Sequence, residues 1–291
     1  MSAPLPSKFV LNIISTAVVL LSAMPASYSA AQTAQGVGVS GSTSVATAGF
    51  AQHTAGMKKH SGLFDIWTSQ EQAKILMAVP QLDRPFLLVT SLPFGLGSND
   101  VGLDRGQAGR SKLVRFERHG KRLFLVQENT RFIADSQNPD ERASVREAFA
   151  GAVLWAGDIL ATEGNTYLVD FSSFLSTDRH GVADTLTRTR QGNYVVDEKR
   201  SAVLSQQAKN FPDNTELEAL LTFAGAGDGS FVRQVAADPK SLRVHQHVSL
   251  IRLPDGYKPR TYHPGSGGLD SEQMDFATPL ADSINVQWQV R

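Results

Sequence analysis

Apolar and polar residues alternate through much of the chain after residue 60, and this period of two predicts β-strands. Residues 63–67 and 74–79 form two such runs and are joined through the polar residues 69–72, which predicts a hairpin. Residues 86–92 form a short, nearly continuous apolar run, which predicts a strand buried on both faces.

Two glycine-containing turns predict further hairpins. His119-Gly120 separates the runs 112–118 and 121–128, and Gly164-Asn165 precedes the apolar run 167–171. A two-residue connection with glycine is typical of a tight hairpin.

The last third of the sequence also favours strands. Residues 242–253 predict a long strand with Val244, Val248 and Leu250 on one face. Residues 215–223 alternate in the same way, but Leu217, Leu220 and Leu221 also fit helical spacing, so both alternatives stay open there.

One helix has clear start signals. Asn138 can cap it, Pro139 suits its first position, and Glu141 stands where a capping box places it. An apolar stripe follows at Val145, Ala148, Phe149 and Ala152. A shorter helix is expected over residues 182–189. The predicted fold is therefore mainly β with minor α: a mostly antiparallel sheet or sandwich with one or two packed helices.

The N-terminus has the pattern of an export signal. Lys8 precedes the apolar residues 9–24, and small residues then lead to a predicted cleavage after Ala31. An uncleaved anchor is the alternative, although the apolar stretch is short for a membrane span. Residues 32–59 are small and polar, which indicates a flexible linker, and residues 60–291 are expected to form one β-rich domain. The expected location is periplasmic or extracellular, with no membrane attachment after cleavage.

Composition excludes several classes of function. The chain has 28 basic and 28 acidic residues and no cysteine. Balanced charge and the lack of a basic patch argue against a nucleic-acid partner. Without cysteine there is no thiol catalysis, no acylated lipoprotein and no cysteine-based zinc site.

The segment from Phe94 to Gly109 is the most unusual in the chain. It places five glycines around Asn99, Asp100, Asp104 and Arg105. Its spacing does not fit a dinucleotide fingerprint, a phosphate loop or an EF-hand. We therefore expect an ordered structural loop or a domain contact, in which Asp104 and Arg105 bind backbone groups.

Histidine and carboxylate positions give only weak candidates for chemistry. None of the seven histidines begins the HExxH motif of zinc peptidases. His245 and His247 should leave the same face of a strand and could supply two metal ligands, or simply be polar residues on a half-exposed face. Asp178 and His180 could be an acid–base pair, a metal half-site or a capping cluster.

Several segments together resemble a known family. They include GLGSNDVGLDRGQ, LVRFERHGKRLFLVQENTRF, NPDERASVREAFAGAVLW, KNFPDNTELEALLTF and HQHVSLIRLPDGYKPR. In this order, over residues 62–260, they resemble the N-terminal region of large secreted bacterial zinc-dependent metalloproteases. The family's catalytic domain follows this region and carries HExxHxxGxxH, and none of those positions maps onto this chain. The pattern departs near residues 263–268, where the family has an Asp-Pro-Arg-x-Gly-like turn.

The resemblance implies an exported, non-catalytic domain that supports or covers a protease domain absent from this chain, whether downstream or separate. It implies no cofactor in the chain itself, with zinc expected only in that other domain. A second hypothesis is a stand-alone exported module that binds a peptide, glycan or cell-envelope partner. A third is an enzyme with an unrecognised metal site at His245 and His247.

Overall fold

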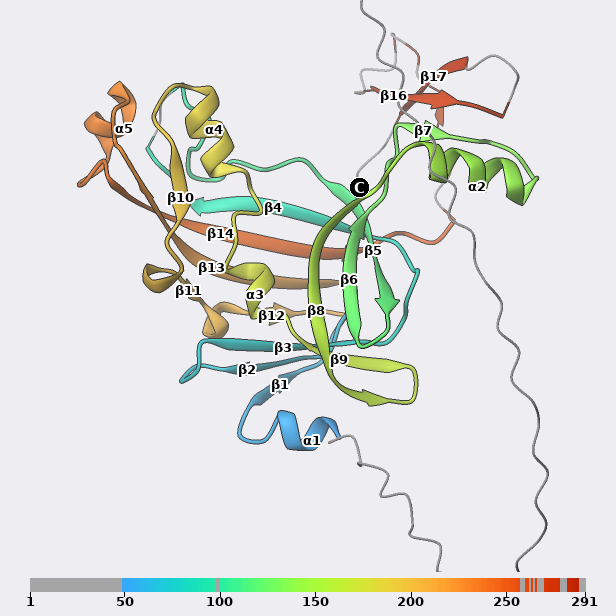
Figure 1. Cartoon of the computed structure of the whole chain (residues 1–291), viewed down its shortest axis with the longest axis horizontal. Coiled ribbons are helices and arrows are strands. Elements are labelled where there is room, and N and C mark those ends of the chain that lie inside the picture. The colour runs from blue at the N-terminus through green and yellow to red at the C-terminus, as the bar shows by residue number, and fades with distance from the viewer. Residues whose placement is uncertain are drawn as a thin grey trace, which may run out of the picture. The chain divides into compact units, whose positions relative to one another are not determined.

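The alternating segments form the framework of the structure, a computed structural model that describes residues 49–97, 100–256, 260–261, 263, 265, 270–277 and 282–287. The described residues belong to one compact unit, Ala46–Arg291. The fold is mainly β with few helices, as the sequence pattern predicts (Figure 1).

One large antiparallel sheet contains 13 of the described strands. Along the sheet the order is β1-β2-β3-β9-β8-β6-β5-β4-β14-β13-β10, and β11 and β12 also pair with β13. Its strands are β1 (Lys58–His60), β2 (Ile66–Ser69), β3 (Lys74–Val79), β4 (Phe86–Phe94), β5 (Lys112–His119), β6 (Arg122–Gln127), β8 (Ala152–Glu163), β9 (Thr166–Asp170), β10 (Tyr194–Val196), β11 (Ala202–Val203), β12 (Lys209–Asn210), β13 (Asn214–Gly225) and β14 (Ser241–Arg252).

A smaller sheet and short helices complete the described chain. The smaller sheet has the order β15-β17-β16-β7, with β7 (Phe132–Ile133) parallel to β16. Its other strands are β15 (Arg260–Thr261), β16 (Asp270–Asp275) and β17 (Asp282–Gln287). The helices are α1 (Phe50–His53), α2 (Pro139–Ala148), α3 (Ser172–Leu175), α4 (Val182–Arg188) and α5 (Ser230–Val235), with 3₁₀ turns η1 (Glu198–Arg200) and η2 (Ser205–Gln207).

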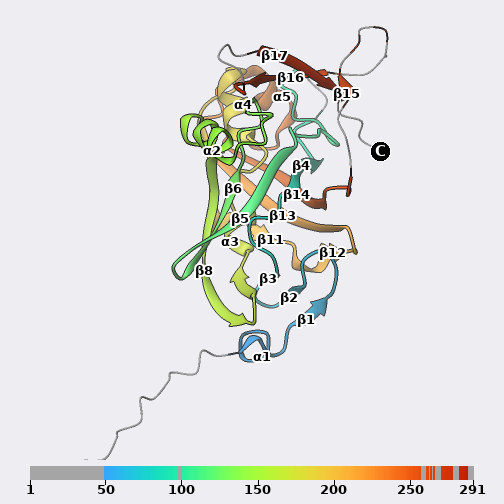
Figure 2. The same ribbon diagram turned by 90° about the vertical axis from the view of Figure 1, so that its right-hand side faces the viewer.

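The large sheet curves until its first strands approach the segment around β12 (Figures 1 and 2). The Asn210 side chain donates hydrogen bonds to the carbonyls of His60 and Phe64, at 2.8 and 2.6 Å. The Leu63 amide donates to the Phe211 carbonyl, and the Ser205 hydroxyl donates to the Ser69 carbonyl. These bonds connect opposite ends of the strand order, so the sheet forms a near-barrel.

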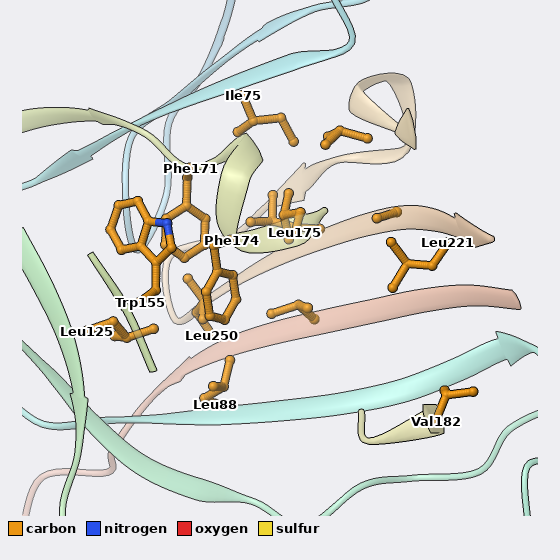
Figure 3. Packing of buried hydrophobic residues seen from close by; sticks show 14 of the residues in the cluster. Ile75, Leu88, Leu125, Trp155, Phe171, Phe174, Leu175, Val182, Leu221 and Leu250 are labelled. Carbon is orange, nitrogen blue, oxygen red and sulfur yellow. The ribbon is translucent and has the colours of Figure 1, made fainter. Parts of the chain in front are cut away.

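The inside of the near-barrel is filled with apolar side chains. Trp155, Phe171 and Phe174 lie together there, beside Leu88 and Leu250 of the adjacent strands β4 and β14 (Figure 3). The Trp155 and Phe171 rings are 5.1 Å apart and nearly perpendicular, and the Trp155 indole donates a hydrogen bond to Ser173. Such aromatic pairs add to the stabilisation from burial alone.

Local signals predicted the hairpins and two helices well. β2 pairs with β3, β5 with β6, and β8 with β9, and the turn glycines Gly120 and Gly164 both have positive φ. The Asn138 side chain accepts a hydrogen bond from the Asp140 amide at the start of α2. The segment with two open alternatives, residues 215–223, is a strand because it pairs along its length with β14.

Three expectations are corrected. Strand β4 is not buried on both faces: its residues alternate between buried and half-buried, because one face meets the interior and the other points outward. Helix α2 ends at Ala148, and Ala152 begins β8, so the apolar stripe is shorter than predicted and only Val145 in it is buried. The third correction concerns the start of the folded region.

The folded chain begins about ten residues before the expected boundary at residue 60. Phe50 in α1 is buried, and its ring packs edge-on against Trp67. Strand β1 pairs with β2 over residues 58–60. Phe50 is the aromatic residue that packs this segment against the sheet. Its neighbours in sequence are mostly small and polar, so the pattern of residues 32–59 gives little sign of a buried position. Residues 32–48 lie outside the described part.

Candidate functional site

The glycine-rich segment folds back so that its last residues run beside β4 and form backbone hydrogen bonds with it. The amides of Leu92 and Leu96 donate to the carbonyls of Gln107 and Leu103, at 3.0 and 2.8 Å. The Gly109 amide donates to the Thr90 carbonyl at 2.7 Å. Leu96, Val101 and Leu103 are buried in the main core. The segment is therefore ordered by its backbone and by apolar burial.

Close packing explains some of these glycines. A Cβ on Gly95 would collide with the Leu103 carbonyl oxygen, and one on Gly109 would collide with the Thr90 hydroxyl. Gly97, Gly102 and Gly106 have positive φ, which other residues adopt at a cost. The glycine density thus serves close backbone approach and left-handed turns.

The charged residues of this segment have different positions. Asp100 and Arg105 are exposed, Asp104 is half-buried, and Asn99 lies outside the described residues. The Asp104 carbonyl accepts a hydrogen bond from the Gln107 amide. The expected role of these side chains in a domain contact stays a prediction.

His247 lies between two glutamates on the outward face of β13 and β14. Its Nε2 atom is 2.5 Å from Glu216 and its Nδ1 atom is 3.2 Å from Glu218. The Ser249 hydroxyl and the Asn214 amide also donate to Glu216. The hydrogen bond to Glu216 raises the pKa of His247 above its usual value, against the effect of burial. For Glu216, burial acts to raise the pKa, but bonds from His247, Ser249 and Asn214 outweigh it and lower the pKa overall.

His245 shares the outward face with His247, as the alternation predicts, but has other neighbours. Its ring packs against Phe94 with the centroids 4.3 Å apart. A bulge in the pairing of β14 with β4 lies between the two histidines. Burial, followed by the nearby charge of Arg243, lowers the pKa of His245. The two rings therefore have opposite electrostatic environments.

Asp178 caps the first turn of α4. Its two carboxylate oxygens accept hydrogen bonds from the amides of Gly181, Val182 and Ala183, at 2.8–3.0 Å. This confirms the capping alternative for Asp178. Negative charge at a helix N-terminus is favourable because the first amides there lack helical partners.

His180 faces a different partner, the Thr90 hydroxyl, which is 3.2 Å from its Nδ1 atom. Burial is the main cause that lowers the pKa of His180. The amides of Arg179 and His180 both donate to the side-chain oxygen of Gln246, which is 1% exposed. Gln246 thus ties this loop to the inward face of β14.

Arg179 is a largely buried cation held by carbonyl groups. It donates to the carbonyls of Phe174 and Leu154, and its guanidinium lies over the Phe174 ring at 4.3 Å from the centroid. Burial lowers its pKa to about 10, against the opposite effect of Asp178. Charge in this position is stabilised by carbonyl dipoles and the ring face.

Sequence reasoning missed Gln246, Arg179 and the glutamate partners of His247. Gln246 had a readable signal, since it is the one polar residue on the inward face between Val244 and Val248. The alternation over residues 215–223 implies only that Glu216 and Glu218 lie on the side opposite Leu217 and Leu221. The proximity of the two glutamates to His247 depends on the register of β13 against β14, which places Glu218 directly opposite His247.

Two features are absent from the part of the chain that the structure describes. The described residues contain no group of three or more histidine, aspartate or glutamate side chains arranged to hold a metal ion. None of the described helices has the length and apolar character that crossing a membrane requires. The metal hypothesis for His245 and His247 stays a prediction, and the proposed cleavage site at Ala31 lies outside the described residues.

Comparison with known families gives a match over the larger part of the chain. Residues 106–291 match a family described as a domain of unknown function, DUF5117. No curated protein and no solved structure matches the chain. The matched segment covers more than half of the chain and contains β5 and every later element. The chain therefore belongs to the DUF5117 family of domains of unknown function.

Proposed function

We propose that this chain is an exported, non-catalytic domain of a zinc metalloprotease-like protein, which supports or covers a separate catalytic domain. The proposal that the domain is non-catalytic is supported by the hydrogen bonds of Asp178 and His247, two of the residues that could have taken part in chemistry. Asp178 binds the amides of α4, and His247 is held between Glu216 and Glu218. These groups stabilise the fold of their own chain.

The protease association rests on the ordered resemblance over residues 62–260. The DUF5117 description names no activity, so this part of the proposal goes beyond the family match. A packed interior suits a supporting role, because a rigid domain can position a neighbour without chemistry of its own.

Incubation of the purified full chain with zinc and casein tests the non-catalytic role. We expect no cleavage above that of a chelator-treated sample, while a known zinc protease digests the casein in parallel. Robust, chelator-sensitive cleavage by the chain would contradict the proposal. It would then favour the third hypothesis, which metal analysis of the same preparation would test at His245 and His247.

The protease association has its own test in the DNA that follows the codon for Arg291. An in-frame HExxH segment there, or in a neighbouring gene whose product binds the purified chain, is the expected result. If neither is found, the association fails and the binding-module hypothesis gains support.

One observation favours that second candidate, an exported binding module. Phe94 is 57% exposed, lies at the start of the glycine-rich segment and packs against His245. Exposed aromatic residues are frequent in recognition surfaces. Binding of the full chain to purified cell-wall material, reduced in a Phe94→Ser variant and unchanged in Val195→Ser, would support it. Val195 is a suitable control because it is 69% exposed on a different strand, β10.

A further inference from the structure

A cavity of about 240 Å³ opens where β14 ends and β4 begins. Its apolar wall includes Phe64, Pro80, Pro85 and Phe86, and two arginines, Arg84 and Arg252, also line it. Phe64 and Phe86 are nearly buried and pack against Phe116, so this wall continues into the aromatic core. The wall is therefore rigid, while the arginines contribute positive charge.

Arg252 occupies an unusual place for a charged residue. The inward face of β14 carries the buried residues Val244, Gln246, Val248 and Leu250, and Arg252 is the next position in that row. Arg252 pairs with Phe86 of β4 across the sheet. The Arg252 side chain is 39% exposed, so it lies beside the apolar wall of the cavity and still meets solvent.

The chain engages these two guanidinium groups only in part. Arg252 donates to the Pro212 carbonyl at 3.0 Å, and its buried Nε atom is 3.2 Å from Asp213 without hydrogen-bond geometry to any acceptor in the described part of the chain. Arg84 donates to Gln81 at 2.9 Å and lies 3.9 Å from Asp255.

The two aspartates beside these arginines, Asp213 and Asp255, bind them only weakly and so would compete little with an incoming anion. Asp213 and Asp255 have side chains that are 78% and 93% exposed. Exposed ion pairs contribute little because water and salt screen them and because both side chains remain mobile. An anion that entered the cavity could therefore take their place.

The size of the cavity limits the occupant. Pockets for drug-sized ligands have volumes of about 300–1,000 Å³, so this cavity suits one small apolar group with an attached anion. A second hollow shares Pro80 and Arg84 with it and extends toward Asn165 and Tyr167. A chain attached to the group in the first cavity could continue through the second.

We propose that this pocket binds the free C-terminal carboxylate of a peptide whose last residue is apolar. The apolar side chain would fill the cavity beside Phe64 and Phe86, and the carboxylate would accept hydrogen bonds from Arg84 and Arg252. Guanidinium groups suit this role because their planar donors match a carboxylate. The inference does not depend on the proposed protease association.

Fluorescence anisotropy with the full chain tests the proposal. The probe is a labelled pentapeptide that ends in leucine with a free carboxylate, and the comparison peptide is identical but amidated at its C-terminus. We expect the amidated peptide to bind at least about tenfold more weakly, because it lacks the charge that the arginines bind. Arg84→Gln and Arg252→Gln should each weaken binding of the free peptide by a similar factor.

Three further variants complete the design. Arg233→Gln removes an exposed arginine on α5, which precedes the first residue of β14, whereas the pocket lies at its last residue; this variant should leave binding unchanged. Asp213→Asn and Asp255→Asn should strengthen binding, since each removes a competing carboxylate. These two variants keep the test decisive if Arg252→Gln fails to fold.

Four results would overturn the proposal: equal affinity for the free and amidated peptides, no effect of either arginine substitution, no binding at millimolar peptide, or equally tight binding of N-acetyl-leucine alone. The last result would show a site for small carboxylic acids in place of a peptide terminus.

Discussion

His247 and its two glutamates form a small electrostatic unit on the outer face of the sheet. Glu216 and Glu218 come from β13, and His247 comes from the neighbouring strand β14. All three side chains are largely buried, with 16–22% of their surface exposed. The charge on the imidazole therefore matters for how strongly the two long strands are held together.

This unit predicts a pH-dependent stability. The folded pKa of His247 is raised by its hydrogen bond to Glu216, so its contribution is complete below the ordinary histidine value of 6.5 and is lost as the pH rises through the folded value. We expect His247→Gln to lower the free energy of unfolding by about 1 kcal/mol more at pH 5.5 than at pH 8.5. Urea denaturation at both pH values measures this difference.

His119→Gln is the matched control for this prediction. Its ring lies 3.1 Å from the single carboxylate Glu117 and is 56% exposed. Because solvent screens exposed ion pairs, we expect this substitution to change the free energy of unfolding only slightly. If the His247→Gln variant lost the same free energy at both pH values, the unit would not act as a charged pair.

Asp178 gives a second prediction for a single residue. Asp178→Ala removes the acceptor for three amides at the start of α4, and we expect a loss of about 2 kcal/mol in the free energy of unfolding. Asp184→Ala removes an exposed carboxylate from the same helix turn and should change the free energy of unfolding by less than about 0.5 kcal/mol. Equal effects of the two substitutions would show that general charge near the helix, and not capping, is what matters.

At the scale of single elements, the glycine-rich segment contains glycines of two kinds: some are required by close packing and others by a positive φ. Gly95 lies against the Leu103 carbonyl, whereas Gly102 has open space around its Cβ position and a φ of +80°. We expect Gly95→Ala to destabilise the fold by more than about 2 kcal/mol, because backbone must move to admit the methyl group. Gly102→Ala should cost only about 1 kcal/mol from its positive φ.

Thermal or urea unfolding of the two glycine variants measures these values. We expect Gly95→Ala to be the more destabilising of the two. A larger loss for Gly102→Ala would mean that backbone conformation, and not close packing, determines the structure of the segment. A substitution of Asp104 by alanine in the same series would show how much its side chain adds to the ordering of the segment.

Local elements were predictable from the sequence because their causes are local. The turns at Gly120 and Gly164 need positive φ, and the cap at Asn138 needs only the amide of Asp140. The end of α2 was not predictable, because Ala152 satisfies helical spacing but pairs with Gln127 in the sheet. Tertiary pairing overrides helix spacing at that point.

The candidate site was less predictable because its contacts join distant segments. Alternation placed His245 and His247 on one face, but their different neighbours depend on β13 and β4. The cavity at Arg252 is assembled from residues that are far apart in sequence. The sequence predicts neighbouring strands only where a short turn joins them, and β4, β13 and β14 are not all joined in that way.

At the scale of the whole molecule, the family boundary at residue 106 divides one sheet. Strand β4 precedes the matched residues, yet it pairs with β14 on one side and β5 on the other. β3, which is also outside the match, pairs with β9. The four strands β1–β4 are therefore structural parts of the domain.

This arrangement predicts that residues 106–291 do not fold alone. Removal of β4 would leave unpaired edges on β5 and β14 and would take the buried residues Leu88 and Leu92 out of the core. We expect a chain of residues 106–291 to aggregate or to lack cooperative thermal unfolding, while a chain that begins at Gln32 unfolds cooperatively. A cooperative transition and dispersed NMR spectrum for the shorter chain would contradict this prediction.

The pairing of β4 with β14 also means that, during synthesis, β4 is made well before one of its two partner strands. Residues 86–91 pair with residues 247–252, which leave the ribosome roughly 10–30 s later at ordinary rates of synthesis. During that interval β4 can pair with β5 but not with β14, so one of its edges has no partner strand. The first strands must therefore be kept from associating with other chains until the last long strand arrives, so production of this domain is expected to be sensitive to translation rate and to holding chaperones.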